Sequence, residues 1–389
     1  MPDAPGHKKT VNSFDVARLA GVSRSAVSRT FTDGASVSKE TRDKVIAAAR
    51  ELGYRVNVLA RSLHKQKSDL VGVVAADLDN PFRSEQIDLL SKGLLECGFR
   101  PILLRGEKST DVADLIGSLL QYSVAGVIVT SDTPPEEICI ECLENGVPLV
   151  VVNKRDPGAP VDRVVTAFED GGRKAYEHLI ASGCRKLAVV TPERSSFSIN
   201  GRALAFEQAA NDGGVPVIRI AWGAQTYDGG LAAAEFVHRV RSEVDGVFCT
   251  ADYLALGVLD GLRHIHGLRV PQDIQVVGYD DIPQAAWKAY DLTTFSQSRH
   301  DLCEATLDLL MQRLENPDLP QQVRVCDVHL VQRATTRGPA GEVLVQVHQL
   351  NCCCPTACWI SSAGQLLGAI SGLSPKGCPV PSSGEIWSR

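Results

Sequence analysis

The sequence contains no apolar run long enough to span a bilayer, and its N-terminus lacks the charged-then-apolar segment of a secretory signal. It also lacks a G-x-S-x-G nucleophile elbow, a phosphate-binding P-loop and an H-E-x-x-H metalloprotease motif. A composition of 44% hydrophobic and 22% charged residues is typical of globular proteins rather than disordered or membrane chains. We therefore expect a cytoplasmic protein that is not an enzyme and has no membrane partner.

The twelve cysteines show neither zinc-ligand spacing nor a disulfide framework. Seven are scattered through apolar stretches, as expected of small buried hydrophobes in a reducing compartment. Cys139 and Cys142 form a C-x-x-C without a second pair or a nearby histidine. The other five follow residue 350, where the adjacent Cys352, Cys353 and Cys354 would hinder a tetrahedral site shared with Cys358. We expect no metal and no cofactor.

Positive charge is concentrated near the N-terminus. The net charge is −6, yet residues 1–65 hold twelve Lys or Arg against six Asp or Glu. A basic head on an acidic body indicates a polyanionic partner for the head alone, or else a small helical domain with a solvated basic face.

A length of 389 residues predicts two or three domains, and the hydrophobic pattern changes along the chain. Residues 10–53 predict three short helices, the third capped by Ser38 and ended by Gly53. Residues 54–68 read as a basic linker with a weak helical pattern over 58–63. From residue 69 onward, apolar strands alternate with helix-length segments, and this rhythm restarts near residue 169. Two successive sets predict two subdomains, each with a parallel sheet covered by helices.

The final segment, residues 338–389, does not continue this rhythm. It is rich in Cys, Pro, Gly and Ser and has no sustained hydrophobic period. We expect it to lie outside the fold.

The stretch FDVARLAGVSRSAVSRTF at residues 14–31 has the features of a helix-turn-helix. Val16, Ala17, Leu19 and Ala20 form an apolar face with small side chains for close crossing, and Gly21 suits the turn. Ser23 is a suitable N-cap for a second helix whose inner face holds Ala26 and Val27. Its outer face then presents side chains suited to phosphates or bases: Arg24, Ser25, Ser28 and Arg29. A helical hairpin with a solvated basic face fits the same periodicity.

Residues 14–63 resemble the DNA-binding headpiece of the lactose/galactose repressor (LacI) family over their entire length. The following body resembles that family's effector-binding core in NPF (80–82), GRALAF (201–206), ADYLALG (251–257) and VPQDIQVVGYDDI (270–282). The resemblance implies an N-terminal all-α helix-turn-helix headpiece and an α/β, two-lobed, periplasmic-binding-protein-like core with two doubly wound parallel sheets.

The implied boundaries are a headpiece over 1–56, a hinge helix and linker over 57–68, and an effector-binding and dimerisation core over 69–337. Within the core, the N-lobe takes 69–166 plus 296–337, and the C-lobe takes 167–295.

The resemblance also assigns DNA-binding roles. Arg24 and Ser25 match the pair that reads major-groove bases, and an arginine at that place suits a bidentate contact with guanine. Leu63 matches an apolar wedge in the minor groove of a hinge helix that orders on operator DNA. Val56 stands where many relatives carry proline. The implied DNA-binding set is Ser23, Arg24, Ser25, Ser28, Arg29, Asn57, Ala60 and Leu63.

An effector site between the two lobes is implied in the same way. Arg202 matches an arginine that binds ligand oxygens, Asp280 an acceptor from hydroxyls or amines, and Phe82 a wall residue. The implied set is Phe82, Lys154, Ser196, Ser198, Arg202, Asp252 and Asp280, with Gln225 less firmly matched.

Two departures from the family bear on the ligand. Ala251 replaces an asparagine of several sugar-binding members, and Pro81, Lys154 and Gln225 replace the aromatics that purine binders stack on the base. Lys154 together with Arg202 favours an anionic ligand such as a sugar acid or sugar phosphate.

The expected function is sequence-specific DNA binding by a homodimeric transcriptional regulator, most simply a repressor in the bacterial nucleoid. Its operator would be near-palindromic double-stranded DNA, and a sugar or sugar derivative would control its affinity. The alternatives are a transporter's solute-binding protein, disfavoured by the basic head and the missing signal segment, and an enzyme, for which GYDD alone is weak evidence of catalytic carboxylates.

Overall fold

The computed structural model describes residues 11–31, 35–55, 68–106 and 111–338. The expected hinge over 57–68, except Ser68, lies outside these residues, as do Asn57, Ala60 and Leu63. The expected tail, apart from Gly338, also lies outside them, together with its cysteines. No helix in the described part of the chain is long and apolar enough to cross a membrane.

The headpiece is formed by α1 (Ser13–Ala20), α2 (Arg24–Thr30) and α3 (Lys39–Leu52). Asn12 caps α1 in a capping box with Asp15, and the left-handed Gly21, at a φ of 65°, ends that helix. The Ser23 hydroxyl accepts from the Ala26 N–H at 3.2 Å and starts α2. The predicted turn glycine and N-cap are thus confirmed, as are Ser38 and Gly53 at the ends of α3.

A small apolar core holds the three helices together. Its buried members come from all three helices: Val16, Ala17, Val27, Val45, Ala48 and Ala49. Small residues dominate because short helices that cross closely leave little room between them. Leu19 departs from the predicted apolar face of α1, because 45% of its surface is exposed.

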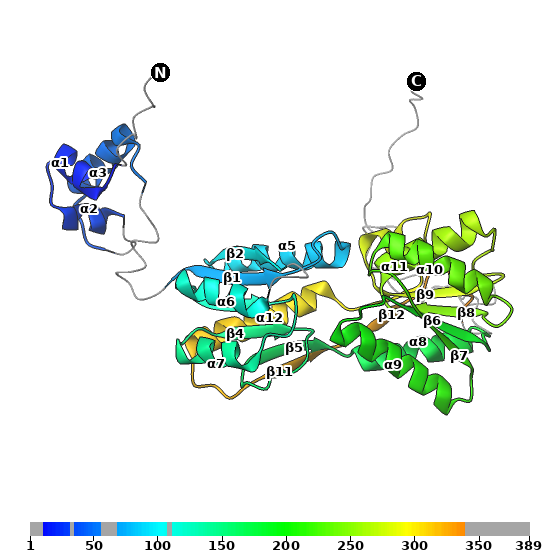
Figure 1. Cartoon of the computed structure of the whole chain (residues 1–389). Helices are drawn as coiled ribbons and strands as arrows, with labels where there is room; N and C mark the ends of the chain where they lie inside the picture. The colour runs from blue at the N-terminus through cyan, green and yellow to red at the C-terminus, as the bar shows by residue number, and fades with distance from the viewer. Residues whose placement is uncertain (1–10, 32–34, 56–67, 107–110, 339–389) are drawn as a thin grey trace, which may run out of the picture. The chain divides into compact units, whose positions relative to one another are not determined.

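The N-lobe sheet contains six strands within the described residues, in the order β11-β5-β4-β3-β1-β2, and all of its pairs are parallel. The strands are β1 (Leu70–Ala75), β2 (Arg100–Arg105), β3 (Gly126–Val129), β4 (Leu149–Val152), β5 (Asp162–Thr166) and β11 (Val323–Cys326). Figure 1 shows this sheet together with the helices packed against it.

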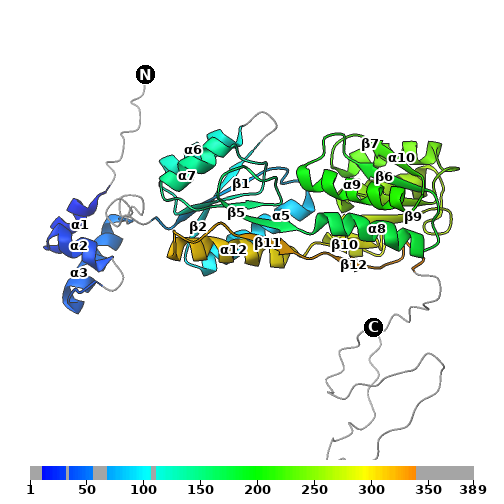
Figure 2. The same cartoon turned by 90° about the horizontal axis from the view of Figure 1, so that it is seen from below.

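Helices cover both faces of the N-lobe sheet (Figure 2). The helices are α5 (Pro81–Glu96) and α12 (Arg299–Glu315) on one face, and α6 (Val112–Gln121) and α7 (Glu136–Glu144) on the other. The central strands β1, β3 and β4 are therefore almost wholly buried, which is why they read as continuous apolar runs.

The C-lobe repeats this design with the order β12-β10-β9-β8-β6-β7, parallel except for the antiparallel pair β10 and β12. Its strands are β6 (Leu187–Thr191), β7 (Val217–Ala221), β8 (Gly246–Cys249), β9 (Gln275–Asp280), β10 (Thr294–Ser296) and β12 (His329–Val331). Its helices are α8 (Phe168–Ala181), α9 (Phe197–Asp212), α10 (Tyr227–Arg239) and α11 (Asp252–Asp260), with the short η1 (Gly261–Ile265) and η2 (Pro283–Ala286). The predicted pair of parallel sheets is confirmed.

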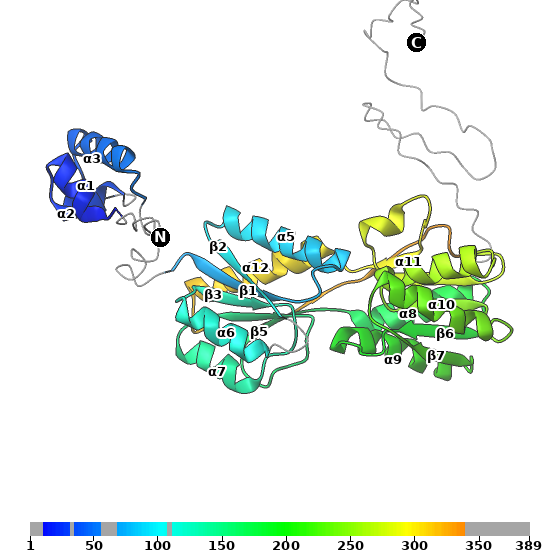
Figure 3. The ribbon, with the colours of Figure 1, turned by 45° about the horizontal axis from the view of Figure 1, so that its top comes forward.

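The chain passes between the lobes three times, after β5, after β10 and after β11. The orange segment that carries β11 and β12 makes the third passage (Figure 3). The expected assignment of 296–337 to the N-lobe is therefore wrong for its last part, because β12 pairs with β10 and the Val276 N–H donates to the Thr335 carbonyl. Two short edge strands carry too weak a pattern to show that they join different sheets.

Glycines allow the two C-lobe helices α10 and α11 to touch backbone to backbone. A Cβ at Gly230 would lie 1.9 Å from the Leu254 carbonyl oxygen, and one at Gly257 would lie 2.0 Å from the Tyr227 carbonyl oxygen. The small residues in this helix pair are therefore required by packing.

Asp252, expected at the effector site, is a structural residue of the C-lobe. It is fully buried, and its carboxylate accepts from the Ile282 N–H at 3.0 Å and the Thr294 hydroxyl at 2.6 Å. These bonds join the start of α11 to the segment after β9 and to the first residue of β10. Burial, followed by the charge of Asp280, raises the pKa of Asp252 to about 7.

Cys139 and Cys142 lie on the buried face of α7, and burial raises their pKa values to about 11 and about 12. The interpretation of this C-x-x-C as two small core residues is confirmed by their packing in the apolar cluster of the N-lobe.

Gly230→Ala should lower the free energy of unfolding by about 1–3 kcal/mol, because the added methyl forces α10 away from α11. Gly117→Ala is the matched control: it is also helical, but nothing lies within 4 Å of its Cβ position, so it should stabilise by about 0.5–1 kcal/mol. Urea unfolding of both variants measures the difference. Equal effects would contradict the close-packing interpretation.

Asp252→Asn should alter the dependence of stability on pH. A carboxyl whose pKa rises on folding from 3.8 to about 7 stabilises the fold below about pH 4, and this contribution disappears as the pH rises through about 7. Relative to Asp252→Asn, the free energy of unfolding of the wild type should fall by about 2–4 kcal/mol as the pH rises from about 4 to about 7. It should fall no further above about pH 7. Urea midpoints from pH 4 to pH 9 test this, and parallel curves would contradict it.

Candidate functional site

The outer face of α2 presents an exposed set of hydrogen-bonding side chains. Arg24, Ser25, Ser28 and Arg29 are all exposed, whereas Ala26 and Val27 on the opposite face are buried. The predicted division of this helix is therefore present in the structure. Such a face can lie in the major groove with its N-terminal residues nearest the base edges.

Neighbouring groups hold the two arginines of α2. The Arg24 guanidinium lies over the exposed Phe14 ring, 3.9 Å from its centroid, and Arg29 Nε donates to the Ser25 carbonyl at 3.3 Å. Ser23 and Ser25 share a hydrogen bond of 2.8 Å between their hydroxyls. The cation–π contact restricts Arg24 before any partner binds while leaving its N–H donors exposed.

In the core, polar side chains gather at the carboxyl ends of both parallel sheets, the position where open α/β sheets bind ligands. These ends enclose a small pocket, hereafter the inner pocket, of about 20 Å³. The residues that line it are Asn80, Phe82, Arg83, Asn153, Ser198, Ile199, Arg202, Gln225, Asp280 and Gln297. Both lobes contribute to this set.

A buried ion pair forms one wall of the inner pocket. Arg202 Nη1 lies 3.3 Å from Asp280 Oδ1, and the two side chains are only 3% and 4% exposed. Arg202 also donates to the Thr250 carbonyl at 2.9 Å and lies 3.7 Å from the Tyr279 ring centroid. Gln297 donates to the same Asp280 oxygen at 2.6 Å.

Asp280 also has an unusual backbone conformation, with a φ of 126° that side-chain-bearing residues rarely adopt. Burial raises the pKa of its carboxyl, while Arg202 acts in the opposite direction. The surrounding bonds hold the carboxylate at the pocket despite this strain.

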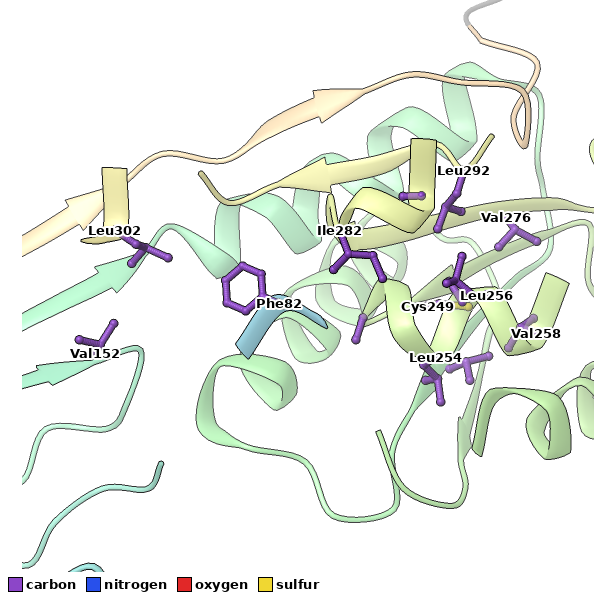
Figure 4. Packing of buried hydrophobic residues seen from close by; sticks show 14 of the residues in the cluster. Phe82, Val152, Cys249, Leu254, Leu256, Val258, Val276, Ile282, Leu292 and Leu302 are labelled. Carbon is purple, nitrogen blue, oxygen red and sulfur yellow. The ribbon is translucent and has the colours of Figure 1, made fainter. Parts of the chain in front are cut away.

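Phe82 is 5% exposed at the start of α5, where Asn80 caps the helix and Pro81 is its first residue. Figure 4 shows its ring between Leu302 and Ile282 in that view, and all three belong to one buried cluster. The expected wall residue thus joins the pocket to the apolar core.

Lys154 and Ser196 line a different space from Arg202. They belong to an open pocket of about 670 Å³, hereafter the outer pocket, formed by residues 131–133, 154–155 and 191–197 with Asn200, Arg219 and Ala221. Burial, followed by the charge of Arg83, lowers the pKa of Lys154 to about 7. The expectation that Lys154 and Arg202 act together on one anion therefore requires revision, because Arg202 already has a carboxylate partner.

The structure brings together four of the expected effector residues, Phe82, Ser198, Arg202 and Asp280, and the less firmly matched Gln225 lines the same pocket. It places Asp252 in the C-lobe interior and not among the residues that line either pocket. Sequence reasoning missed Asn80, Arg83, Asn153, Ile199 and Gln297. The first two flank Phe82 and could have been found there, whereas Gln297 follows a three-residue strand that gives no local signal.

Chemically, the inner pocket suits a polyhydroxylated ligand. A guanidinium offers a fork of donors, a carboxylate accepts from hydroxyls, and an aromatic side chain forms an apolar wall. These groups can hold such a ligand by hydrogen bonds and apolar contact.

Comparison with known proteins agrees with this geometry. Residues 14–57 match the family model for bacterial regulatory proteins of the lacI family, and residues 176–336 match a periplasmic binding protein-like domain. The HTH-type transcriptional repressor PurR of Vibrio atlanticus is 29% identical over 328 residues, covering 83% of this chain and 98% of that protein. The ribose operon repressor of Halalkalibacterium halodurans is 29% identical, with coverages of 83% and 96%.

Solved structures show the same arrangement. A Lac repressor dimer bound to operator and the anti-inducer ONPF matches with a TM-score of 0.74 and 28% identity, covering 84% of this chain and 99% of that one. A LacI family regulator from Enterococcus faecium with bound ribose matches with a TM-score of 0.63 and 26% identity, with coverages of 69% and 99%. This chain therefore belongs to the lacI family of bacterial regulatory proteins, with a helix-turn-helix headpiece joined to a periplasmic-binding-protein-like core.

Proposed function

We propose that the chain is a homodimeric transcriptional repressor that binds a near-palindromic operator through α2. Its affinity for the operator falls or rises when a sugar-like effector enters the inner pocket. The observation that carries the proposal is the buried Arg202–Asp280 pair lining a pocket at the carboxyl ends of both sheets, in a chain whose headpiece exposes Arg24 and Ser25. A repressor acts on the chromosome, so we place it in the bacterial cytoplasm at the nucleoid.

The relatives support a sugar-like effector. Structural neighbours were solved with ribose and, in a regulator named CelR, with cellobiose. Relatives with other names, such as the repressor PurR, have similar overall identity, so the pocket residues rather than overall similarity favour this ligand class. A paired arginine and aspartate can donate to and accept from the hydroxyl groups of a sugar ring. The face of an uncharged purine offers them no such hydrogen-bonding groups.

The size of the inner pocket suggests how binding is coupled to DNA. A space of about 20 Å³ holds roughly one water molecule, whereas a sugar ring needs several times more. Entry of a sugar must therefore move groups from both lobes, including Arg83 of the N-lobe and Arg202 of the C-lobe. A ligand that binds one lobe arrangement better shifts the population toward it, and with it the separation of the two headpieces.

The alternatives fit less well. A transporter's solute-binding protein shares the core, but its function does not require a DNA-binding headpiece. The relatives are transcriptional repressors rather than enzymes, and we propose that this chain also lacks catalytic activity. Footprinting on the genomic region around its gene tests the regulator proposal directly, because a protected near-palindrome is expected and uniform weak binding would contradict it.

Arg24→Ala should weaken binding to that footprinted operator about 5- to 150-fold, because one bidentate contact with guanine contributes about 1–3 kcal/mol. Arg18→Ala removes the same charge from α1, where the side chain is 82% exposed and paired with Asp15, and should leave the ratio of specific to non-specific affinity near the wild-type value. Fluorescence anisotropy at several salt concentrations measures both. An equal loss in the two variants would show that Arg24 contributes only charge.

Arg202→Gln should destabilise the protein by about 3–5 kcal/mol, because it leaves the Asp280 carboxylate buried without its cation. The double variant Arg202→Gln/Asp280→Asn should recover most of that stability in urea unfolding and still fail to bind the effector by calorimetry. A double variant that binds sugars normally would show that the pair only supports the fold.

A further inference from the structure

The strongest unexplained feature of the core is a buried lysine with which no carboxylate pairs among the described residues. Lys154 is 3% exposed, and within the described residues it forms no hydrogen bond and no ion pair. Burying an ammonium without a partner is costly. Arg202, by contrast, has its carboxylate at 3.3 Å.

A second cation increases this imbalance. Arg83, at the start of α5, donates to the Thr130 carbonyl at 3.1 Å and forms no ion pair among the residues that the structure describes. The positive charge of Arg83 lowers the pKa of Lys154. The charges of Asp77 and Asp132 raise that pKa, although both carboxylates lie beyond ion-pair distance. Arg83 lines the inner pocket and Lys154 the outer pocket, and Asn153 of the inner pocket directly precedes Lys154 in the chain.

Unused hydrogen-bonding groups surround the same place. The Ser131 and Ser196 hydroxyls are buried, and neither has a hydrogen-bond partner in the part of the chain that the structure describes. Ser196 is the N-cap of the 16-residue α9, yet its side chain caps no N–H group of the first turn. The first N–H groups of a helix have no intrahelical acceptor and carry the positive end of the helix dipole.

The topology explains why these groups meet. Ser131 follows β3, Lys154 follows β4, and Ser196 follows β6, so each lies beyond the carboxyl end of a parallel strand. The first two belong to the N-lobe and the third to the C-lobe. An anion bound here would contact both lobes.

We propose that the outer pocket at Lys154, Ser131 and Ser196 binds the phosphate group of a phosphorylated sugar whose ring occupies the inner pocket. The inference rests on the proposed function and adds the chemical class of the effector. A phosphate monoester has three terminal oxygens for an ammonium, two hydroxyls and the N–H groups of α9, whereas a carboxylate has only two. Asp132 and Glu193 also line this pocket, but both are exposed and solvated.

The first test uses inorganic phosphate as the probe with the full-length protein at constant ionic strength. Phosphorus NMR line broadening should show saturable binding to the wild type, at least tenfold weaker binding to Lys154→Met, and retention in Lys154→Arg. Lys288→Met, a change at an exposed lysine outside both pockets, is the matched control and should behave as the wild type. Phosphate bound at the basic headpiece is common to all variants and cancels in the comparison. Equal binding by the wild type and Lys154→Met would overturn the inference.

The second test compares glucose 6-phosphate, glucose and gluconate by calorimetry on the wild type and Lys154→Met. A phosphate preference of at least tenfold that disappears in Lys154→Met supports the inference. Tighter binding of glucose or gluconate than of glucose 6-phosphate overturns it. If no sugar changes operator affinity, the proposed function fails, while the phosphate titration still decides the subsite on its own.

Discussion

The buried contact between Arg202 and Asp280 is the interaction on which the core depends. It joins α9 to the end of β9, and Gln297 of the second passage between the lobes donates to the same carboxylate. Parallel sheets place the residues after their strands at one edge, so two such sheets can supply a pocket from opposite sides. At that edge, burial makes each charge dependent on its neighbours, because water is not available to solvate it.

Charges in the two pockets therefore divide into two kinds. Arg202 is neutralised within the protein and is positioned by Thr250, Tyr279 and Asp280. Lys154 is buried just as deeply, yet no carboxylate among the described residues pairs with it, and burial and the charge of Arg83 lower its pKa to about 7. The first arrangement is complete without a ligand, whereas the second becomes favourable only when an anion arrives. This difference separates a residue that shapes the site from one that selects the ligand's charge.

The headpiece follows a different rule, because its core is small and local features define where its helices begin and end. Capping by Asn12, Ser23 and Ser38 and the left-handed glycines at the ends of α1 and α3 define the three helices. Local rules of this kind operate within a few residues of sequence. For this reason, the helix boundaries and the exposed face of α2 could be predicted, whereas the stacking of Arg24 on Phe14 depends on how α1 and α2 cross.

By itself, the sequence determined the helix-turn-helix, the two sets of buried strands and the identity of Phe82, Arg202 and Asp280 as pocket residues, because periodicity, caps and family motifs are written in short segments. Only the tertiary structure decided that β12 joins the second sheet, that Asp252 is interior, and that Lys154 lies in a pocket apart from Arg202. These outcomes depend on contacts between segments far apart along the chain. Whether a buried charge has a partner depends on distances of a few ångströms between such segments. These distances cannot be predicted from the pattern of residues within any one segment.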